Sequence, residues 1–194
     1  MTLGAPNEGT NASENRQRHR SCGIKLWPDA AAELCMSSFQ LIGLLPGQFS
    51  HLFSLSGEQL APLGIMRVTA DSKPGFPCRI SLQDAEPGDE LLLLPYEHQP
   101  AASPYRASGP IYVRVRSQQS NLRPGEIPPY VALRQISVRA YDAHHMMLAA
   151  EVCPGDAVAA EIQRQFSNPR VAYSHLHNAK RGCFSCRVER YESG

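Results

Sequence analysis

The chain has 194 residues, with 19 Lys and Arg against 18 Asp and Glu and a formal net charge of +1. Its length suits one domain of roughly 100–150 residues plus an appendage. The balanced charge excludes a generally basic nucleic-acid-binding protein, and no apolar run approaches the roughly 20 residues of a membrane-spanning helix. We therefore expect no nucleic-acid partner and no membrane partner.

Residues 1–37 differ in composition from the rest of the chain. Gly, Asn, Ser and Glu are frequent there, and a basic cluster lies at 16–20. Such a segment has too little apolar surface to offset the entropy lost on ordering, so we predict a disordered N-terminal extension over 1–37 and a single domain over 38–191. The first residues lack the apolar segment of a secretion signal. This predicts a cytoplasmic location, in which the six cysteines stay reduced.

In chain order, the first predicted helix begins after Ser56. Ser56 can cap this helix, and Gln59 three residues later completes a capping box. Leu55 and Leu60 are spaced to form a hydrophobic staple. Gly64 then provides a left-handed C-cap, which ends the helix.

A second helix is predicted over 156–166. Asp156 is its expected cap, and Val158, Ile162 and Phe166 recur every four residues on one stripe. We expect this helix and the first one to pack on the same face of one sheet.

Strands are predicted from alternating hydrophobicity and from the turn residues between them. They cover residues 65–70, 78–82, 91–98, 111–115, 136–141, 146–152, 171–178 and 184–190. The fold class is therefore α+β, with a mainly antiparallel sheet of about seven or eight strands and two or three short helices.

Several predicted strands carry an arginine opposite an apolar face. Arg79, Arg114 and Arg139 are the three examples. If these faces line one concavity, the guanidinium groups could hold a carboxylate or a phosphate. Alternatively, the arginines lie on the solvated face of an antiparallel sheet.

The loop between the strands at 91–98 and 111–115 is rich in Tyr, Arg, Glu, His and Pro. Ordered loops at sheet ends commonly carry binding groups. Alternatively, Glu97 and Arg106 pair with each other and only hold the loop in place.

His175 and His177 are two residues apart on a predicted strand, so both side chains lie on one face, together with Tyr173. Two imidazoles at this spacing could chelate a metal, with His98 or Glu97 as a third ligand. The set of ligands is poor, and we predict no metal. We favour a proton-transfer role, because imidazole titrates near neutrality and neighbouring arginines would keep it neutral at pH 7.

Cys183 and Cys186 form a CxxC motif. On a strand, residues three apart point to opposite faces, and no second CxxC completes a zinc site. Cys186 is therefore predicted in the core, on one face with Phe184 and Val188. Cys183 and Cys78 are candidate nucleophiles if a base lies nearby.

Eight short runs occur together in an order that resembles one family. They are 73–79 (KPGFPCR), 81–85 (SLQDA), 96–98 (YEH), 103–106 (SPYR), 108–111 (SGPI), 139–142 (RAYD), 177–178 (HN) and 182–184 (GCF). On these runs the chain resembles a bacterial family known as domain of unknown function 1203, over about residues 39–190. The resemblance implies a small single-domain bacterial protein and no particular activity, cofactor or partner. The residues before 39 lie outside it, as a real extension or a misassigned start.

These observations predict a small-molecule-binding domain whose ligand carries an anionic group, and they leave open whether it is an enzyme. The predicted catalytic residues are His175 and His177. The predicted ligand-binding residues come from the polar loop, the strands and the last turn: Arg79, Tyr96, Glu97, His98, Tyr105, Arg106, Ser108, Arg139, Tyr141, Asp142 and Asn178. The alternative is a non-catalytic protein-interaction module that uses the same polar surface. The sequence indicates no cofactor and no oligomeric state.

Overall fold

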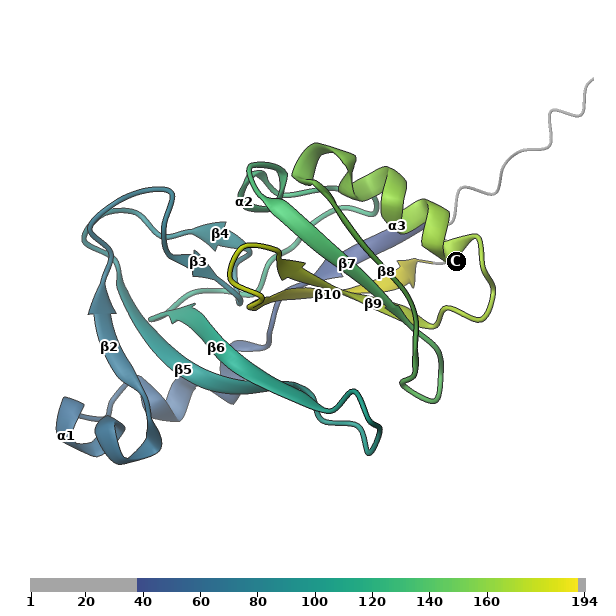
Figure 1. Ribbon diagram of the computed structural model, residues 1–194. Coiled ribbons are helices and arrows are strands. Elements are labelled where there is room, and N and C mark those ends of the chain that lie inside the picture. Colours follow the sequence, from purple (N-terminus) through teal and green to yellow (C-terminus); the bar gives the residue numbers. More distant parts are fainter. Residues whose placement is uncertain (1–37, 192–194) are drawn as a thin grey trace, which may run out of the picture. The chain divides into compact units, whose positions relative to one another are not determined.

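The computed structural model describes residues 38–191, and the predicted extension at 1–37 lies outside them (Figure 1). Sheet A is antiparallel throughout, in the order β1-β10-β9-β7-β8. Its strands are β1 (Ser38–Ile42), β7 (Gln135–Tyr141), β8 (Met147–Pro154), β9 (Tyr173–Asn178) and β10 (Phe184–Tyr191). Sheet B has the order β2-β5-β6-β3-β4 and contains one parallel pair, β3 with β6. Its strands are β2 (Met66–Thr69), β3 (Pro77–Cys78), β4 (Gln83–Asp84), β5 (Glu90–Gln99) and β6 (Ala107–Arg114).

The α+β class is confirmed, but the prediction of one sheet with seven or eight strands is wrong. The strands described between residues 38 and 191 form two sheets of five. Each sheet has its own apolar core, with Val138 and Leu176 in that of sheet A and Leu92 and Ile111 in that of sheet B. Alternation tells which side chains share a face but not which strands pair. The pairing of β1 with β10, from opposite ends of the domain, is such a non-local choice.

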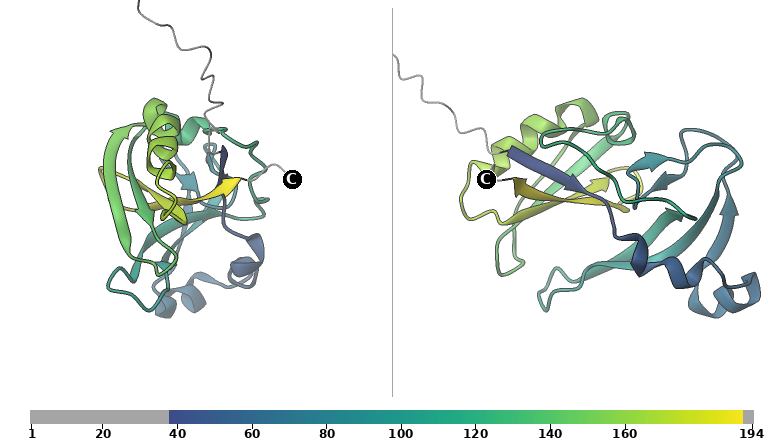
Figure 2. Two further views of the ribbon diagram at one scale, coloured as in Figure 1. Left: turned by 90° about the vertical axis from the view of Figure 1, so that its right-hand side faces the viewer. Right: turned by 180° about the vertical axis from the view of Figure 1, so that it is seen from behind.

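The helices pack on different cores, so the prediction that they share one sheet face is wrong. Helix α3 (Val158–Phe166) lies across sheet A and buries its predicted stripe there (Figures 1 and 2). Helix α1 (Gly57–Leu60) places Leu60 in the core of sheet B. A further short helix, α2 (Pro129–Ala132), was not predicted. None of the helices between residues 38 and 191 has the length and hydrophobicity needed to cross a membrane.

Four 3-10 turns complete the described structure. They are η1 (Pro46–Gln48), η2 (Ser50–Leu52), η3 (Ala61–Leu63) and η4 (Gly155–Ala157). The prediction that Asp156 caps α3 is wrong, because Asp156 lies inside turn η4. The N-cap of α3 is Ala157, which makes no side-chain hydrogen bond.

The capping box at Ser56 is confirmed. The Ser56 hydroxyl accepts from the Gln59 N–H at 3.3 Å, and the Gln59 side chain accepts from the Ser56 N–H at 2.8 Å. Gly64 adopts the expected left-handed conformation, with φ of 69°.

We expect Ser56→Ala to lower the free energy of unfolding by about 1 kcal/mol, the usual cost of losing an N-cap. Urea denaturation measures the change. Ser54→Ala is the control, because the exposed Ser54 hydroxyl has only a long bond, 3.4 Å, to the His51 carbonyl. Equal effects of the two substitutions would contradict a capping role.

Two local irregularities position the residues discussed below. The predicted strand at 78–82 ends at Cys78, and residues 79–82 form a turn in which Leu82 has a φ of 53°. In β10 a bulge lies between Phe184 and Cys186. The prediction that these two residues share a face with Val188 is therefore wrong, since Phe184 joins the core of sheet B while Cys186 and Val188 join that of sheet A.

Candidate functional site

A cavity of about 1010 Å³ is lined by residues from sheet B, from α2 and η4, and from the turn between β9 and β10. Its apolar wall includes Leu93, Pro110, Tyr112 and Leu133. Its charged lining residues are four basic side chains and one acidic one: Arg79, Arg134, Lys180, Arg181 and Asp156. The cavity therefore combines apolar surface with an excess of positive charge.

Arg79 is the most unusual of the cations, because it is only 2% exposed. Its Nε donates to the Phe184 carbonyl at 2.8 Å, and its Nη1 donates to the Pro77 carbonyl. Within residues 38–191, no carboxylate pairs with this guanidinium and no acceptor meets Nη2. Burial lowers the pKa of Arg79 from its ordinary value. An arginine side chain is effectively always protonated in proteins, so Arg79 is a cation at pH 7.

The other cations of the cavity are in different situations. Arg134 is neutralised, because Nη1 and Nη2 donate to the two carboxylate oxygens of Asp84 at 2.9 and 2.6 Å. Lys180 and Arg181 are exposed in the turn after β9 and form no ion pair with any described residue. The nearby Asn178 has a buried Oδ1 that no described donor reaches. Arg79, Lys180 and Arg181 therefore carry positive charge that the described carboxylates do not neutralise.

Backbone hydrogen bonds hold the Arg79 turn against the rest of the fold. The Arg79 N–H donates to the Tyr112 carbonyl at 3.0 Å, and its carbonyl accepts from the Leu44 N–H at 2.8 Å. The next carbonyl, that of Ile80, accepts from the Ser120 N–H at 2.9 Å. Because these bonds come from three separate segments, the guanidinium is held in a fixed place before any ligand arrives.

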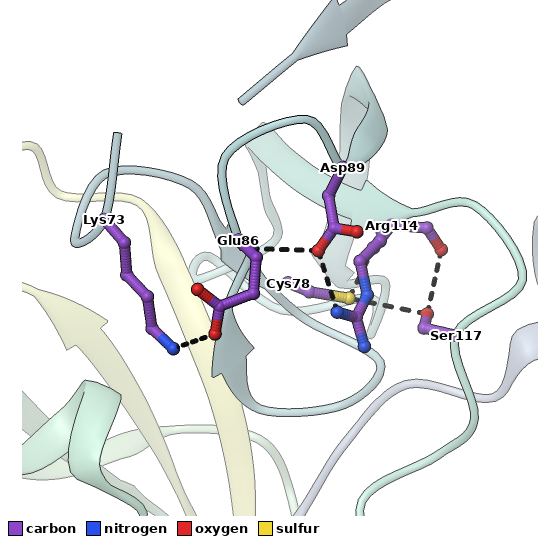
Figure 3. A network of polar contacts seen from close by, with 6 residues as sticks. All are labelled: Lys73, Cys78, Glu86, Asp89, Arg114 and Ser117. Atoms are coloured by element: carbon purple, nitrogen blue, oxygen red, sulfur yellow. Dashed lines mark hydrogen bonds and ion pairs between the residues drawn. The ribbon is translucent and has the colours of Figure 1, made fainter. Parts of the chain in front are cut away.

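A polar network supports the strand before this turn (Figure 3). Asp89 accepts from Arg114 at 2.9 Å, and the Arg114 N–H donates to the Cys78 sulfur at 3.2 Å. Burial raises the pKa of Cys78, but hydrogen bonds from Ser81, Arg114 and Ser117 outweigh it and leave the pKa lowered. The thiol is completely buried, so in this conformation it cannot serve as the nucleophile we considered.

Three histidines gather around Phe184, where the end of β5 meets β9. The ring centroids of His98 lie 5.0 Å from His177 and 6.1 Å from His175, and the two β9 rings lie 6.3 Å apart. Phe184 stacks on His98 at 5.1 Å and meets both other rings edge-on. The spacing of His175 and His177 does put them on one strand face, as their positions in β9 predict.

Both β9 histidines are buried and neutral. Burial, with smaller contributions from the charges of Arg187 and Arg139, lowers the pKa of His175 to about 2, and burial with Arg139 and Arg79 lowers that of His177 to about 3. The direction agrees with the expectation, although burial and not arginine is the main cause. His177 donates from Nδ1 to the Gly182 carbonyl at 3.0 Å, which leaves Nε2 as a lone-pair acceptor without a described partner. Their proton-transfer role remains a prediction.

Tyrosines extend this cluster along sheet A. Tyr141 stacks on Tyr173 at 5.2 Å, and Tyr105 meets Tyr141 edge-on at 6.2 Å. The Tyr173 hydroxyl accepts from Gln99 at 2.7 Å and lies 2.9 Å from the His145 Nδ1. Tyr96 contacts Phe184 at 6.2 Å. Several of the predicted site residues thus belong to one packed cluster of histidines and tyrosines. These residues do not line the cavity.

The arginines expected to hold one anion lie in three different surroundings. Arg79 lines the cavity, whereas Arg139 is paired in register with His175 on sheet A. Arg106 is exposed and pairs with Glu97 at 2.6 Å, which is the alternative we considered for this loop. Among the remaining predicted residues, Ser108 is exposed on β6, and Asp142 accepts from two N–H groups of the β7–β8 turn.

Some residues of the candidate site were not predicted, namely Arg134, Lys180 and Arg181. Lys180 and Arg181 follow the predicted Asn178 in the same turn, and this adjacency was the available signal. Arg134 could not be found from the sequence, because it reaches the cavity from the bend that follows the unpredicted helix α2. In the described part of the chain, no group of three or more His, Cys, Asp or Glu side chains is arranged to hold a metal ion.

Fold and site together define a two-sheet α+β protein with a basic cavity at the β9–β10 turn. The model of the family described as "Protein of unknown function (DUF1203)" matches residues 75–190, and the chain belongs to this family. The match contains Arg79, the β9–β10 turn and all three clustered histidines. No curated protein and no solved structure matches the chain significantly.

Proposed function

We propose that this protein binds a small anionic molecule in its cavity, with the carboxylate or phosphate group held by Arg79. The observation that carries the proposal is the burial of this guanidinium without a described carboxylate partner. Taking a charge out of water costs several kcal/mol unless an opposite charge compensates. A ligand anion facing Nη2 would supply that charge, and a planar guanidinium suits bidentate binding of either anion.

The rest of the cavity supports a ligand with an apolar body. Leu93, Tyr112 and Leu133 offer apolar surface, and ligand pockets are commonly mostly apolar with a few polar groups that set orientation. Lys180 and Arg181 would attract an anion toward the entrance. Of the ligand-binding residues predicted from the sequence, Arg79 and Asn178 line the cavity, and the proposal rests on these two.

The alternative function, a protein-interaction module, would be favoured by a flat surface. A cavity of about 1010 Å³ instead lies at the upper end of the roughly 300–1,000 Å³ usual for small-molecule sites. It therefore favours a small molecule over a protein partner. We keep the cytoplasm as the proposed location.

A thermal-shift and calorimetric screen with inorganic phosphate, phenyl phosphate and benzoate tests the proposal. We expect at least one of them to stabilise the wild type, by about 2.7 kcal/mol when present at 100 times its Kd. Arg79→Met should weaken binding about 10- to 100-fold, because a hydrogen bond to a charged group contributes about 1.5–3 kcal/mol.

Arg106→Met is the matched control, since this exposed arginine already pairs with Glu97 outside the cavity. It should leave the affinity unchanged. Arg79→Lys keeps the charge but not the forked donors, so it should bind at an intermediate level and shows whether the site still folds. If no anion stabilises the wild type, or if the arginine variants bind equally well, the proposal is wrong.

A further inference from the structure

We propose that Cys183 is a reactive thiol of the same cavity and forms mixed disulfides selectively with anionic disulfides. This inference rests on the proposed function, because the anion held by Arg79 would bring the disulfide to the sulfur. The ligand class it adds is a small disulfide that carries a carboxylate or a phosphate.

The geometry ties the thiol to the buried cation. Cys183 lines the cavity, is partly exposed and is a free thiol. The residue that follows it, Phe184, presents the carbonyl that accepts from the Arg79 Nε at 2.8 Å. The guanidinium is therefore bonded to the residue next in sequence to the one that carries the thiol. The sulfur itself has a weak contact, 3.7 Å, to the Arg181 carbonyl.

A cysteine at a cavity is not by itself a binding site, and the second observation here is Arg79. This side chain is 98% buried, since it is 2% exposed, and its Nη2 has no acceptor among the described residues. Arg79 and Cys183 line the same cavity, so a ligand held by the guanidinium lies in the space that the thiol also borders. Lys180 and Arg181 add positive charge three and two residues before the thiol.

The chain contains a matched control for this environment. Cys153 is also partly exposed and free, but its neighbours are acidic. Burial and the charges of Glu161, Glu151 and Asp156 raise the pKa of its thiol. An anionic reagent should be repelled there and attracted at Cys183. Cys78 and Cys186 are buried and should react slowly with both anionic and neutral reagents.

The proposed reaction is thiol–disulfide exchange. The Cys183 thiol loses its proton to solvent, and the thiolate attacks one sulfur of the reagent R–S–S–R′. A new S–S bond joins the Cys183 sulfur to the sulfur that carries R. The S–S bond of the reagent breaks, and R′–S⁻ leaves with its electron pair. The reagent disulfide is thus the oxidant, and no further reactant is needed.

Peptide-resolved mass spectrometry of the full-length protein measures the rate at each cysteine separately. The probes are the dianionic disulfide dithiobis(nitrobenzoate) and the neutral disulfide dithiodipyridine. We expect the ratio of the anionic to the neutral rate to be at least about 10-fold higher at Cys183 than at Cys153, in line with electrostatic effects on association rates. Arg79→Met should lower the Cys183 ratio toward that of Cys153.

Equal ratios at Cys183 and Cys153 in the wild type would overturn the inference, whether or not the arginine variant folds. A Cys183 ratio that Arg79→Met leaves unchanged, in a folded variant, would overturn it as well. The proposed function fails separately. If inorganic or phenyl phosphate stabilises the protein through Arg79 while the ratios are equal, anion binding stands and only the role of Cys183 is wrong.

Discussion

Acidification to about pH 4.5 is expected to lower the free energy of unfolding by about 5 kcal/mol, with most of the loss caused by His175 and His177. Their pKa values in the folded protein are about 2 and about 3, whereas in the unfolded chain both return to about 6.5. Between these pKa values, the two histidines are protonated in the unfolded state and neutral in the folded state. Each of these protons changes the free energy of unfolding by about 1.36 kcal/mol per pH unit. The two histidines together therefore give a slope of about 2.7 kcal/mol per pH unit.

The sign follows from the lowered pKa values. The stabilisation is fully present above pH 6.5 and is lost progressively as the pH falls toward the folded pKa values. The charged groups that face the pair are Arg139, Arg187, Arg79 and His98, and none of them is an acid that could stabilise an imidazolium. Burial also lowers the pKa of His98, so its titration acts in the same direction. The lowered pKa values of the carboxyl groups of Asp89, Asp142 and Glu161 contribute mainly below about pH 4.5, near the unfolded pKa values of about 3.9 for Asp and 4.3 for Glu.

Urea denaturation between about pH 7.5 and pH 4.5 measures this slope. His175→Phe removes one titrating ring from an aromatic environment and should reduce the slope to about 1.4 kcal/mol per pH unit. His144→Gln is the control, because His144 is exposed in the β7–β8 turn, and it should leave the slope unchanged. A wild-type stability that stays constant down to pH 5 would contradict the burial of two neutral histidines.

Gly43→Ala is expected to destabilise the fold by about 3 kcal/mol or more, the upper range for overpacking a rigid site. A Cβ at this position would overlap the carbonyl oxygen of Ile80 and approach the Ser120 hydroxyl at 2.8 Å. The Ile80 carbonyl cannot easily move, because the Ser120 N–H donates to it. Since Ile80 follows Arg79 in the same turn, the variant should also bind phosphate more weakly.

Gly47→Ala is the matched control for this substitution. A Cβ at Gly47 meets nothing within 4 Å, and the residue lies in the exposed turn η1. Its free energy of unfolding should stay within about 0.5 kcal/mol of the wild type. If both variants are equally stable in urea, the close approach of Gly43 to the Arg79 turn is not present in solution.

The parts of the fold that depend on neighbouring residues could be predicted from the sequence. The capping box at Ser56, the left-handed Gly64 and the buried stripe of α3 are all local patterns, and each is confirmed. The division into two sheets is not local, because it depends on pairings such as β1 with β10. Asp156 shows the same limit on a smaller scale, since the short turn η4 takes the place of the expected cap.

The candidate site shows why strand alternation was an incomplete guide. Alternation predicts Arg79 as the polar residue of a strand, yet Arg79 lies in a turn and is buried. His175 and His177 were placed correctly on one face, because β9 is regular over its whole length. The sequence could not tell whether Arg106 and Arg139 lie in the same site. Their relative positions depend on how the β5–β6 ribbon packs against sheet A.

The signals of the Arg79 guanidinium itself, observed by nitrogen-15 NMR, test the central claim most directly. Its Nε–H donates to the Phe184 carbonyl inside the protein, so this signal should be protected from exchange and resolved from those of exposed arginines. Titration with phenyl phosphate should shift the Arg79 Nε and Nη signals until they saturate, while the Arg106 signals stay in place. Arg79 signals that do not move while an anion stabilises the protein would show that the anion binds elsewhere, and would contradict the account.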